Sequence, residues 1–166
     1  QSGLSREQKG KCPHCKVKLA STEEETAELA RGWAEKGKAW AQAFLGNAYK
    51  FGSGVKQSYE KATEYFKKAI QQRDPNAMYG LGSMYVLGHG FTKSIDKAIE
   101  LYTQAANQGH VIAQCDVGVM YYNGDGFDQS FELAREWWIK AAVQDHEQAL
   151  KMLQMLDEQE GRTTPT

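Results

Sequence analysis

Apolar residues recur along this chain at helical spacing, and the same apolar frame returns every 36 residues. In the segment 113–127, Ala113, Val117, Met120 and Tyr121 fall at i, i+4, i+7 and i+8, so they share one face of a helix. Two earlier copies of the frame are Ala77, Leu81, Met84, Tyr85 and Ala41, Leu45, Ala48, Tyr49. A fixed period of this length predicts stacked helical units rather than one globular core.

A glycine turn follows each of these helices and predicts where the chain reverses. The turns 52–54, 88–90 and 124–126 each have Gly at both ends, and Gly readily takes the positive φ that ends a helix. A serine with an acid two residues later then predicts the N-cap of a second helix in each unit. These serines are Ser58, Ser94 and Ser130. Glycines inside the first helices, at 46, 82 and 118, indicate that a partner helix crosses there too closely for a Cβ.

The pattern predicts an all-α fold, an α/α superhelical solenoid of helix-turn-helix repeats of about 36 residues. We expect Ser21 to cap the leading helix, because Glu24 follows at capping-box spacing. The expected organisation is a flexible segment 1–20, a solenoid 21–158 and a flexible tail 159–166. Within the solenoid we expect a half repeat 21–36, full repeats 37–72, 73–108 and 109–144, and a capping helix 145–158.

The repeated unit A-x-x-x-L-G-x-x-Y-x-x-G-x-G-[VF], followed by [KL]-A-x-x-x-[YFW] and A-[AI], resembles the Sel-one-like repeat (SLR) family, relatives of tetratricopeptide repeats. The resemblance covers about residues 22–158. It implies a non-enzymatic scaffold or adaptor that binds a protein or peptide partner on its concave surface. The chain departs from the family in having serines at 58, 94 and 130, where Asp is common, and Val117 in place of Leu.

Tetratricopeptide-like stacking would form the concave surface from the face of each first helix that points away from the core. By helical spacing, the expected partner-binding residues are Trp40, Ala43, Asn47, Lys50, Asn76, Tyr79, Ser83, Val86, Ile112, Cys115, Val119 and Tyr122. We expect Trp40, Tyr79 and Tyr122 to act as anchors and Asn47 to hydrogen-bond a partner's backbone or carboxylate. The alternative is that some of these side chains pack against the neighbouring repeat.

Charge and composition narrow the partner class. With 20 basic and 21 acidic residues the formal net charge is −1, which gives no electrostatic reason to expect nucleic acid or an anionic membrane. No apolar run approaches the roughly 18 residues of a membrane helix, so we expect no membrane insertion. Of the three cysteines only Cys115 lies in the repeats, so no disulfide framework is expected. Because disulfide-poor proteins are typical of reducing compartments, an intracellular, cytoplasmic location is favoured.

Cys12-Pro13-His14-Cys15 has the spacing of half a zinc site. It also resembles the last ligand pair of a RING finger, which in some proteins precedes such repeats. The pair is therefore the end of a finger whose other ligands lie upstream, a metal site of this chain, or an incidental pair. Zinc at Cys12 and Cys15 is expected only with the upstream finger present. In that case the repeats would be the partner-binding part of a RING-type ubiquitin ligase.

No catalytic constellation is found, and no enzymatic activity is expected. His110 and His146 stand at the repeat position that Asp74 occupies in an earlier unit, so helix capping explains them better than catalysis. His89 lies in a glycine turn without a nucleophile or carboxylate pair nearby in the sequence. The glycine turns lack the preceding strand and the Gly-Lys-Ser/Thr of a phosphate loop.

Overall fold

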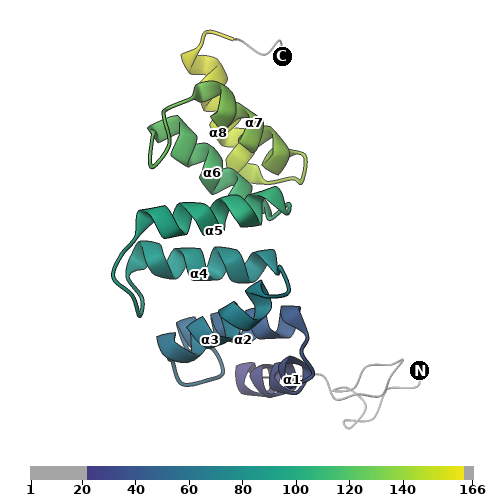
Figure 1. The fold of residues 1–166 in the computed structure, drawn as a ribbon. Helices are drawn as coiled ribbons and strands as arrows, with labels where there is room; N and C mark the ends of the chain where they lie inside the picture. Colours follow the sequence, from purple (N-terminus) through teal and green to yellow (C-terminus); the bar gives the residue numbers. More distant parts are fainter. Residues whose placement is uncertain (1–21, 163–166) are drawn as a thin grey trace, which may run out of the picture. The chain divides into compact units, whose positions relative to one another are not determined.

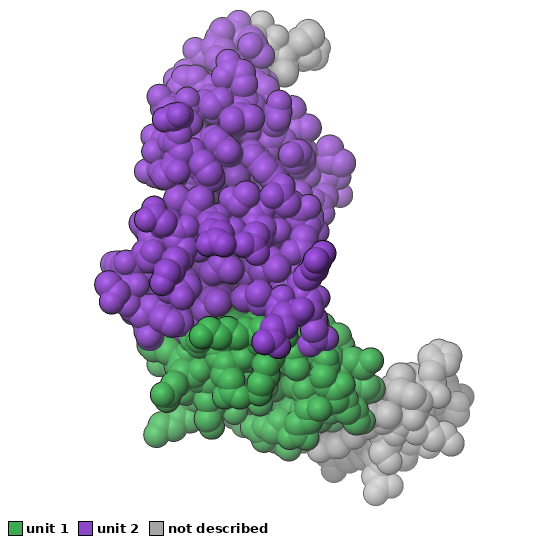
Figure 2. Space-filling model, in the orientation of Figure 1, with its two compact units in different colours: residues 1–69 green, residues 70–166 purple. Residues whose placement is uncertain are grey.

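The computed structural model describes residues 22–162, which form eight α-helices and no strand (Figure 1). The helices are α1 Glu23–Glu35, α2 Ala39–Phe51, α3 Tyr59–Ile70, α4 Pro75–Leu87, α5 Ile95–Asn107, α6 Val111–Asn123, α7 Phe131–Ala142 and α8 Glu147–Gln159. The chain divides into two compact units, residues 1–69 and 70–166 (Figure 2). The all-helical repeat fold predicted from the apolar period is confirmed.

The first helices of the repeats, α2, α4 and α6, end as the glycine turns predict. Their C-caps Gly52, Gly88 and Gly124 all have left-handed backbone conformation, with φ of 80°, 73° and 79°. Each cap N–H donates to a carbonyl four residues earlier, which satisfies one of the acceptors left open at a helix end. Tight reversals therefore set the length of each first helix.

The second helices start at the predicted serines. The Oγ atoms of Ser94 and Ser130 accept hydrogen bonds from the N–H groups of Lys97 and Leu133, and Ser58 accepts one from Lys61. The leading helix departs from the prediction by one residue, because Thr22 rather than Ser21 is the N-cap of α1. The Thr22 Oγ1 lies 3.1 Å from the N–H of Glu25, the three-residue spacing at which a cap side chain reaches the first turn.

Within unit 2 every helix packs against the next one in sequence, from α4 to α8. One buried cluster, including Met78, Tyr102 and Val117, lies between α4, α5 and α6. A second, including Cys115, Trp138 and Leu156, lies between α6, α7 and α8. In unit 1, α1 packs on α2, and α2 packs on α3. Burial of apolar side chains between successive helices thus stabilises each unit.

The glycines inside α2, α4 and α6 lie where an aromatic ring of the same repeat crosses the helix. A Cβ on these glycines would lie 2.5 Å from Phe66 at Gly46, 2.7 Å from Tyr102 at Gly82 and 2.5 Å from Trp138 at Gly118. Real Cβ atoms do not approach so closely, so the close crossing predicted from sequence is confirmed. These aromatic rings join the two helices of one repeat.

Candidate functional site

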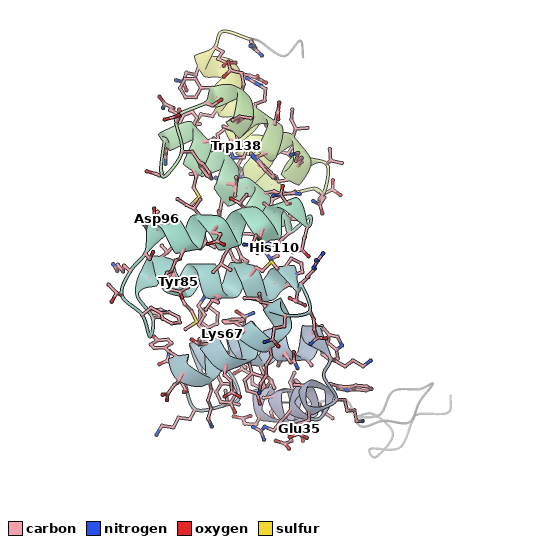
Figure 3. The ribbon with its side chains drawn as sticks, viewed as in Figure 1. Glu35, Lys67, Tyr85, Asp96, His110 and Trp138 are labelled. Carbon is pink, nitrogen blue, oxygen red and sulfur yellow. The ribbon has the colours of Figure 1, made fainter. Side chains whose placement is uncertain are left out.

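A cleft of about 390 Å³ opens beside the N-terminal ends of α4 and α6 in unit 2. Its walls are Pro75, Asn76, Gln108, Gly109, His110, Val111 and Ile112. The first turns of the two helices and the turn that joins α5 to α6 therefore form it, and His110 is labelled in Figure 3. The lining combines aliphatic side chains with two amides and one imidazole.

His110 belongs to a set of three N-caps at equivalent repeat positions. Asp74 accepts a hydrogen bond from the N–H of Ala77 at 3.0 Å, and His110 Nδ1 accepts one from Ala113 at 3.1 Å. His146 Nδ1 accepts from Ala149 at 3.2 Å. The capping role predicted for both histidines is confirmed. An accepting Nδ1 must be unprotonated, and burial lowers the pKa of His110, which favours the neutral imidazole that its cap requires.

Tyr79 connects the cleft to the interior of unit 2. Its ring stacks between those of His110 and Tyr102, with centroid distances of 4.7 Å and 5.0 Å. Its hydroxyl donates a hydrogen bond of 3.0 Å to Oδ2 of Asp116 on α6. Burial and the neighbouring carboxylate raise the pKa of Tyr79, so this hydroxyl stays protonated and remains a donor.

Asp116 is a partly buried carboxylate on α6. Burial raises its pKa, while the hydrogen bond from Tyr79 and the nearby His146 act in the opposite direction. Desolvation is the largest of these effects, so the fold disfavours the charge that Asp116 carries at neutral pH. Sequence reasoning missed this residue, because it considered only the positions at i, i+3, i+7 and i+10 of α6.

The twelve residues expected to bind a partner divide into three groups by exposure. Trp40, Asn76 and Ile112 are exposed. Asn47, Tyr79, Ser83, Val86, Val119 and Tyr122 are partly buried. Ala43, Lys50 and Cys115 are buried, not open as expected. The four residues on α2 belong to unit 1, and the other eight to unit 2.

Cys115 is buried because it faces the second helix of its own repeat. It packs with Trp138, whose Nε1 donates a hydrogen bond of 3.1 Å to the Cys115 carbonyl oxygen. Burial raises the pKa of its thiol to about 11, so Cys115 is not a reactive thiolate at neutral pH. Lys50 is also buried, and burial lowers the pKa of its ammonium group. Neither side chain is open for a partner.

The two tyrosines proposed as anchors on α4 and α6 both use their hydroxyls within unit 2. Tyr79 donates to Asp116, and Tyr122 donates to Oε1 of Gln159 at 2.8 Å. The ring of Tyr122 also lies 5.2 Å from that of Phe131. Both hydroxyls therefore contact a neighbouring helix pair of unit 2, as expected if these side chains pack between repeats. Asn47 likewise donates to a carbonyl of its own helix, that of Ala43.

Unit 1 carries an exposed pair of tryptophans. The rings of Trp33 on α1 and Trp40 on α2 lie 6.4 Å apart, and the ammonium group of Lys36 lies 4.9 Å from the Trp33 ring. Both tryptophans are exposed. Trp33 stands at the repeat position of three buried alanines, Ala69, Ala105 and Ala141, so its exposure departs from the pattern of the full repeats.

Two buried glutamines were also missed. Gln42 Nε2 donates to the carbonyl oxygen of Ala34, and Gln114 Nε2 donates to that of Ala106, at 3.3 Å and 3.2 Å. Each side chain thus satisfies an acceptor at the end of the preceding helix. The signal was available in the sequence, since the two glutamines lie at the same repeat position.

No group of three or more His, Cys, Asp or Glu side chains within residues 22–162 is placed to hold a metal ion. Cys12 and Cys15 lie outside the described residues, so the zinc prediction is not addressed. Across the same described range, no helix has the length and apolar character needed to cross a membrane.

A sequence model described as Sel1 repeat matches residues 41–74, 75–110 and 111–146. The chain belongs to the Sel1 repeat family. Proteins of this family generally serve as protein-interaction scaffolds. The predicted resemblance to SLR proteins is confirmed. Comparison with curated proteins gives no significant match.

Solved structures support the same assignment. A Sel1 repeat protein from Oxalobacter formigenes is 26% identical with a TM-score of 0.77, over 89% of this chain and 60% of its own length. A protective antigen of uropathogenic Escherichia coli displaying an SLR fold is 27% identical with a TM-score of 0.74, over 85% of this chain and 30% of its own. Helicobacter pylori cysteine rich protein B shares the fold at 23% identity and a TM-score of 0.61, over 80% of this chain and 98% of its own. The chain thus spans less than two thirds of the first two proteins.

Proposed function

We propose that this Sel1 repeat protein is a non-enzymatic scaffold that binds a protein or peptide segment on unit 2, with the cleft between α4 and α6 as the main contact. The observation that carries the proposal is the cleft itself, because it combines an exposed isoleucine with two side-chain amides. We refer to Asn76 and Tyr79 on α4 with Ile112 and Asp116 on α6 as the α4/α6 surface. These pairs are three and four residues apart, so each pair shares one face of its helix.

The chemistry of the cleft suits a polypeptide. Pro75, Val111 and Ile112 offer aliphatic surface for a side chain of the partner. The amide of Asn76 can donate to and accept from a peptide backbone. The Gln108 side-chain oxygen can accept, while its Nε2 already donates to Met78 Sδ and to the Gln104 carbonyl oxygen. Sites that recognise ligands commonly pair apolar walls with a few polar groups in this way. The lining contains no nucleophile and no carboxylate, which favours binding over catalysis.

A matched pair of isoleucine substitutions tests the proposal. Ile112 lines the cleft and is 47% exposed, whereas Ile139 on α7 is 46% exposed and lies outside the cleft. Removing either side chain exposes no core, so both Ile112→Ser and Ile139→Ser should fold as the wild type does. We expect Ile112→Ser to lose partners that Ile139→Ser retains. The measurement is quantitative mass spectrometry of proteins co-purified with each variant, with circular dichroism to check folding.

The same experiment can contradict the proposal. Equal recovery of every partner by the two variants would show that the cleft is not the contact. The exposed Trp40 in unit 1 is a second proposed contact, and Trp40→Ala in the same assay tests it separately.

A further inference from the structure

The repeats themselves provide an internal comparison for Asp116. Counting in steps of 36 residues, its position is occupied by Phe44 in α2, Gly80 in α4 and Met152 in α8. Helices of the same fold thus form with an aromatic residue, with no side chain, or with a thioether at this place. The fold thus forms without an acid at this position, and the hydrogen bond from Tyr79 does not by itself require one, because a neutral acceptor could also take it.

Asp116 forms no ion pair with another described residue of unit 2. Helices α4 and α6 contain no other Asp, Glu, Lys or Arg. Asp116 belongs to none of the ion pairs formed by the described residues of unit 2, which are Arg135 with Asp157 and Glu160, Lys151 with Glu147, and Arg162 with Glu160. The nearby His146, the N-cap of α8, acts to lower the pKa of Asp116 but forms no ion pair with it.

The surroundings of the carboxylate suit a cationic side chain. Tyr79 holds Oδ2 by a single hydrogen bond, whereas an ionised carboxylate can accept about four. Tyr79, which bonds the carboxylate, stacks on His110, and His110 lines the cleft. A charge-assisted hydrogen bond to a partly buried carboxylate is stronger than one in water. An incoming cation would also compensate the desolvation that raises the pKa of Asp116.

We propose that Asp116 recognises a lysine or arginine side chain of the segment bound on the α4/α6 surface, with the Tyr79 hydroxyl orienting the carboxylate. This inference rests on the proposed function and adds the chemical class of the partner. Ile112 and Asp116 are four residues apart on α6, about one helical turn. If an apolar side chain of the bound segment occupies the cleft, a basic residue one or two positions away in that segment would therefore reach Asp116.

The test uses the 166-residue chain and two probe peptides of nearly equal size and shape, one with a cationic side chain and one with a neutral side chain. The first is acetyl-Gly-Arg-Gly-amide, and the second has citrulline in place of arginine. Carbon-detected NMR of the carboxyl groups follows Asp116 and the exposed loop residue Asp128. We expect the arginine peptide to shift the Asp116 signal saturably and the citrulline peptide to leave it unchanged.

Two variants complete the test. Asp116→Asn should keep the fold. It should lower the affinity for the arginine peptide, measured from the NMR signals of the Tyr79 ring, by about tenfold or more, because a hydrogen bond to a charged group is lost. Asp128→Asn removes the same charge elsewhere and should bind as the wild type does. Equal response to both peptides, or unchanged binding by Asp116→Asn, would overturn the inference.

The outcome is separable from that of the proposed function. If partner capture depends on Ile112 while Asp116 does not respond to arginine, the inference alone fails. If Asp116 binds arginine but capture is indifferent to Ile112, the proposed cleft contact alone fails.

Discussion

The substitution Gly118→Ala tests the packing that joins the two helices of a repeat. A Cβ at this position would lie 2.5 Å from both Cδ1 and Nε1 of Trp138. The indole is fully buried and its Nε1 bonds the Cys115 carbonyl oxygen, so it has little room to move. Overpacking a buried site costs about 1–3 kcal/mol, and alanine returns about 1 kcal/mol of helix propensity. With the clash at the rigid ring, we expect a net loss of about 2 kcal/mol.

That loss corresponds to a fall in Tm of roughly 4–8 °C for a chain of this size. The measurement is thermal and urea unfolding followed by circular dichroism. Gly32→Ala is the matched control, because Gly32 lies within α1 and a Cβ there would meet no atom within 4 Å. It should raise stability by up to about 1 kcal/mol. If Gly118→Ala were as stable as the wild type while Gly32→Ala behaved as expected, the close-crossing argument would be refuted.

Two further predictions concern titrating groups of unit 2. Burial raises the pKa of Asp116, so the folded state favours the protonated carboxyl group. The stability that this group contributes is present below the ordinary carboxyl pKa and is lost as pH rises through the folded pKa. In urea unfolding, Asp116→Asn should therefore be more stable than the wild type at pH 7 and no more stable near pH 3. A less stable variant at pH 7 would contradict this. Burial lowers the pKa of His110, so the folded state favours the neutral imidazole. The free energy of unfolding at pH 7.5 should therefore decrease as pH falls, first through the ordinary histidine pKa and then through the lower pKa of the folded state. His110→Asn preserves an N-cap without an imidazole, so it should reduce this fall between pH 7.5 and 5.5, and an identical pH profile would count against the cap argument.

The repeated residues were the most predictable part of the fold. A capping residue or a glycine is needed for a local structural reason. When the same residue type recurs at one position of three repeats, chance is a poor explanation for it. The serine caps, the histidine caps at His110 and His146 and the close glycine at Gly118 were all predicted in this way and found. The one error of this kind, Ser21 in place of Thr22, arose where two adjacent hydroxyl residues offer nearly the same capping spacing.

The exposed face of each first helix was less predictable. Helical spacing shows which side of the helix a residue is on, but it does not show which other side chains lie on that side. Ala43, Tyr79 and Cys115 share one repeat position, yet the first and third are buried and Tyr79 extends to reach Asp116. Side-chain size decides the outcome at this position. The cleft beside Ile112 was equally hidden, since it forms from turns that are distant in sequence.

The charges on the first helices connect stability to function. Across α2, α4 and α6 the only Asp, Glu, Lys or Arg residues are Lys50 and Asp116. Burial shifts the pKa of each towards its neutral form, so each charge reduces the stability of the unit that contains it. Equivalent repeat positions carry Val86 and Gly80, which shows that the fold forms without a charge at either place. A residue that costs stability, that the repeat does not need and that is not fully buried is expected where a partner is recognised. Lys50 is buried and fails the last condition, whereas Asp116 is partly exposed and lies one helical turn from Ile112 of the proposed cleft.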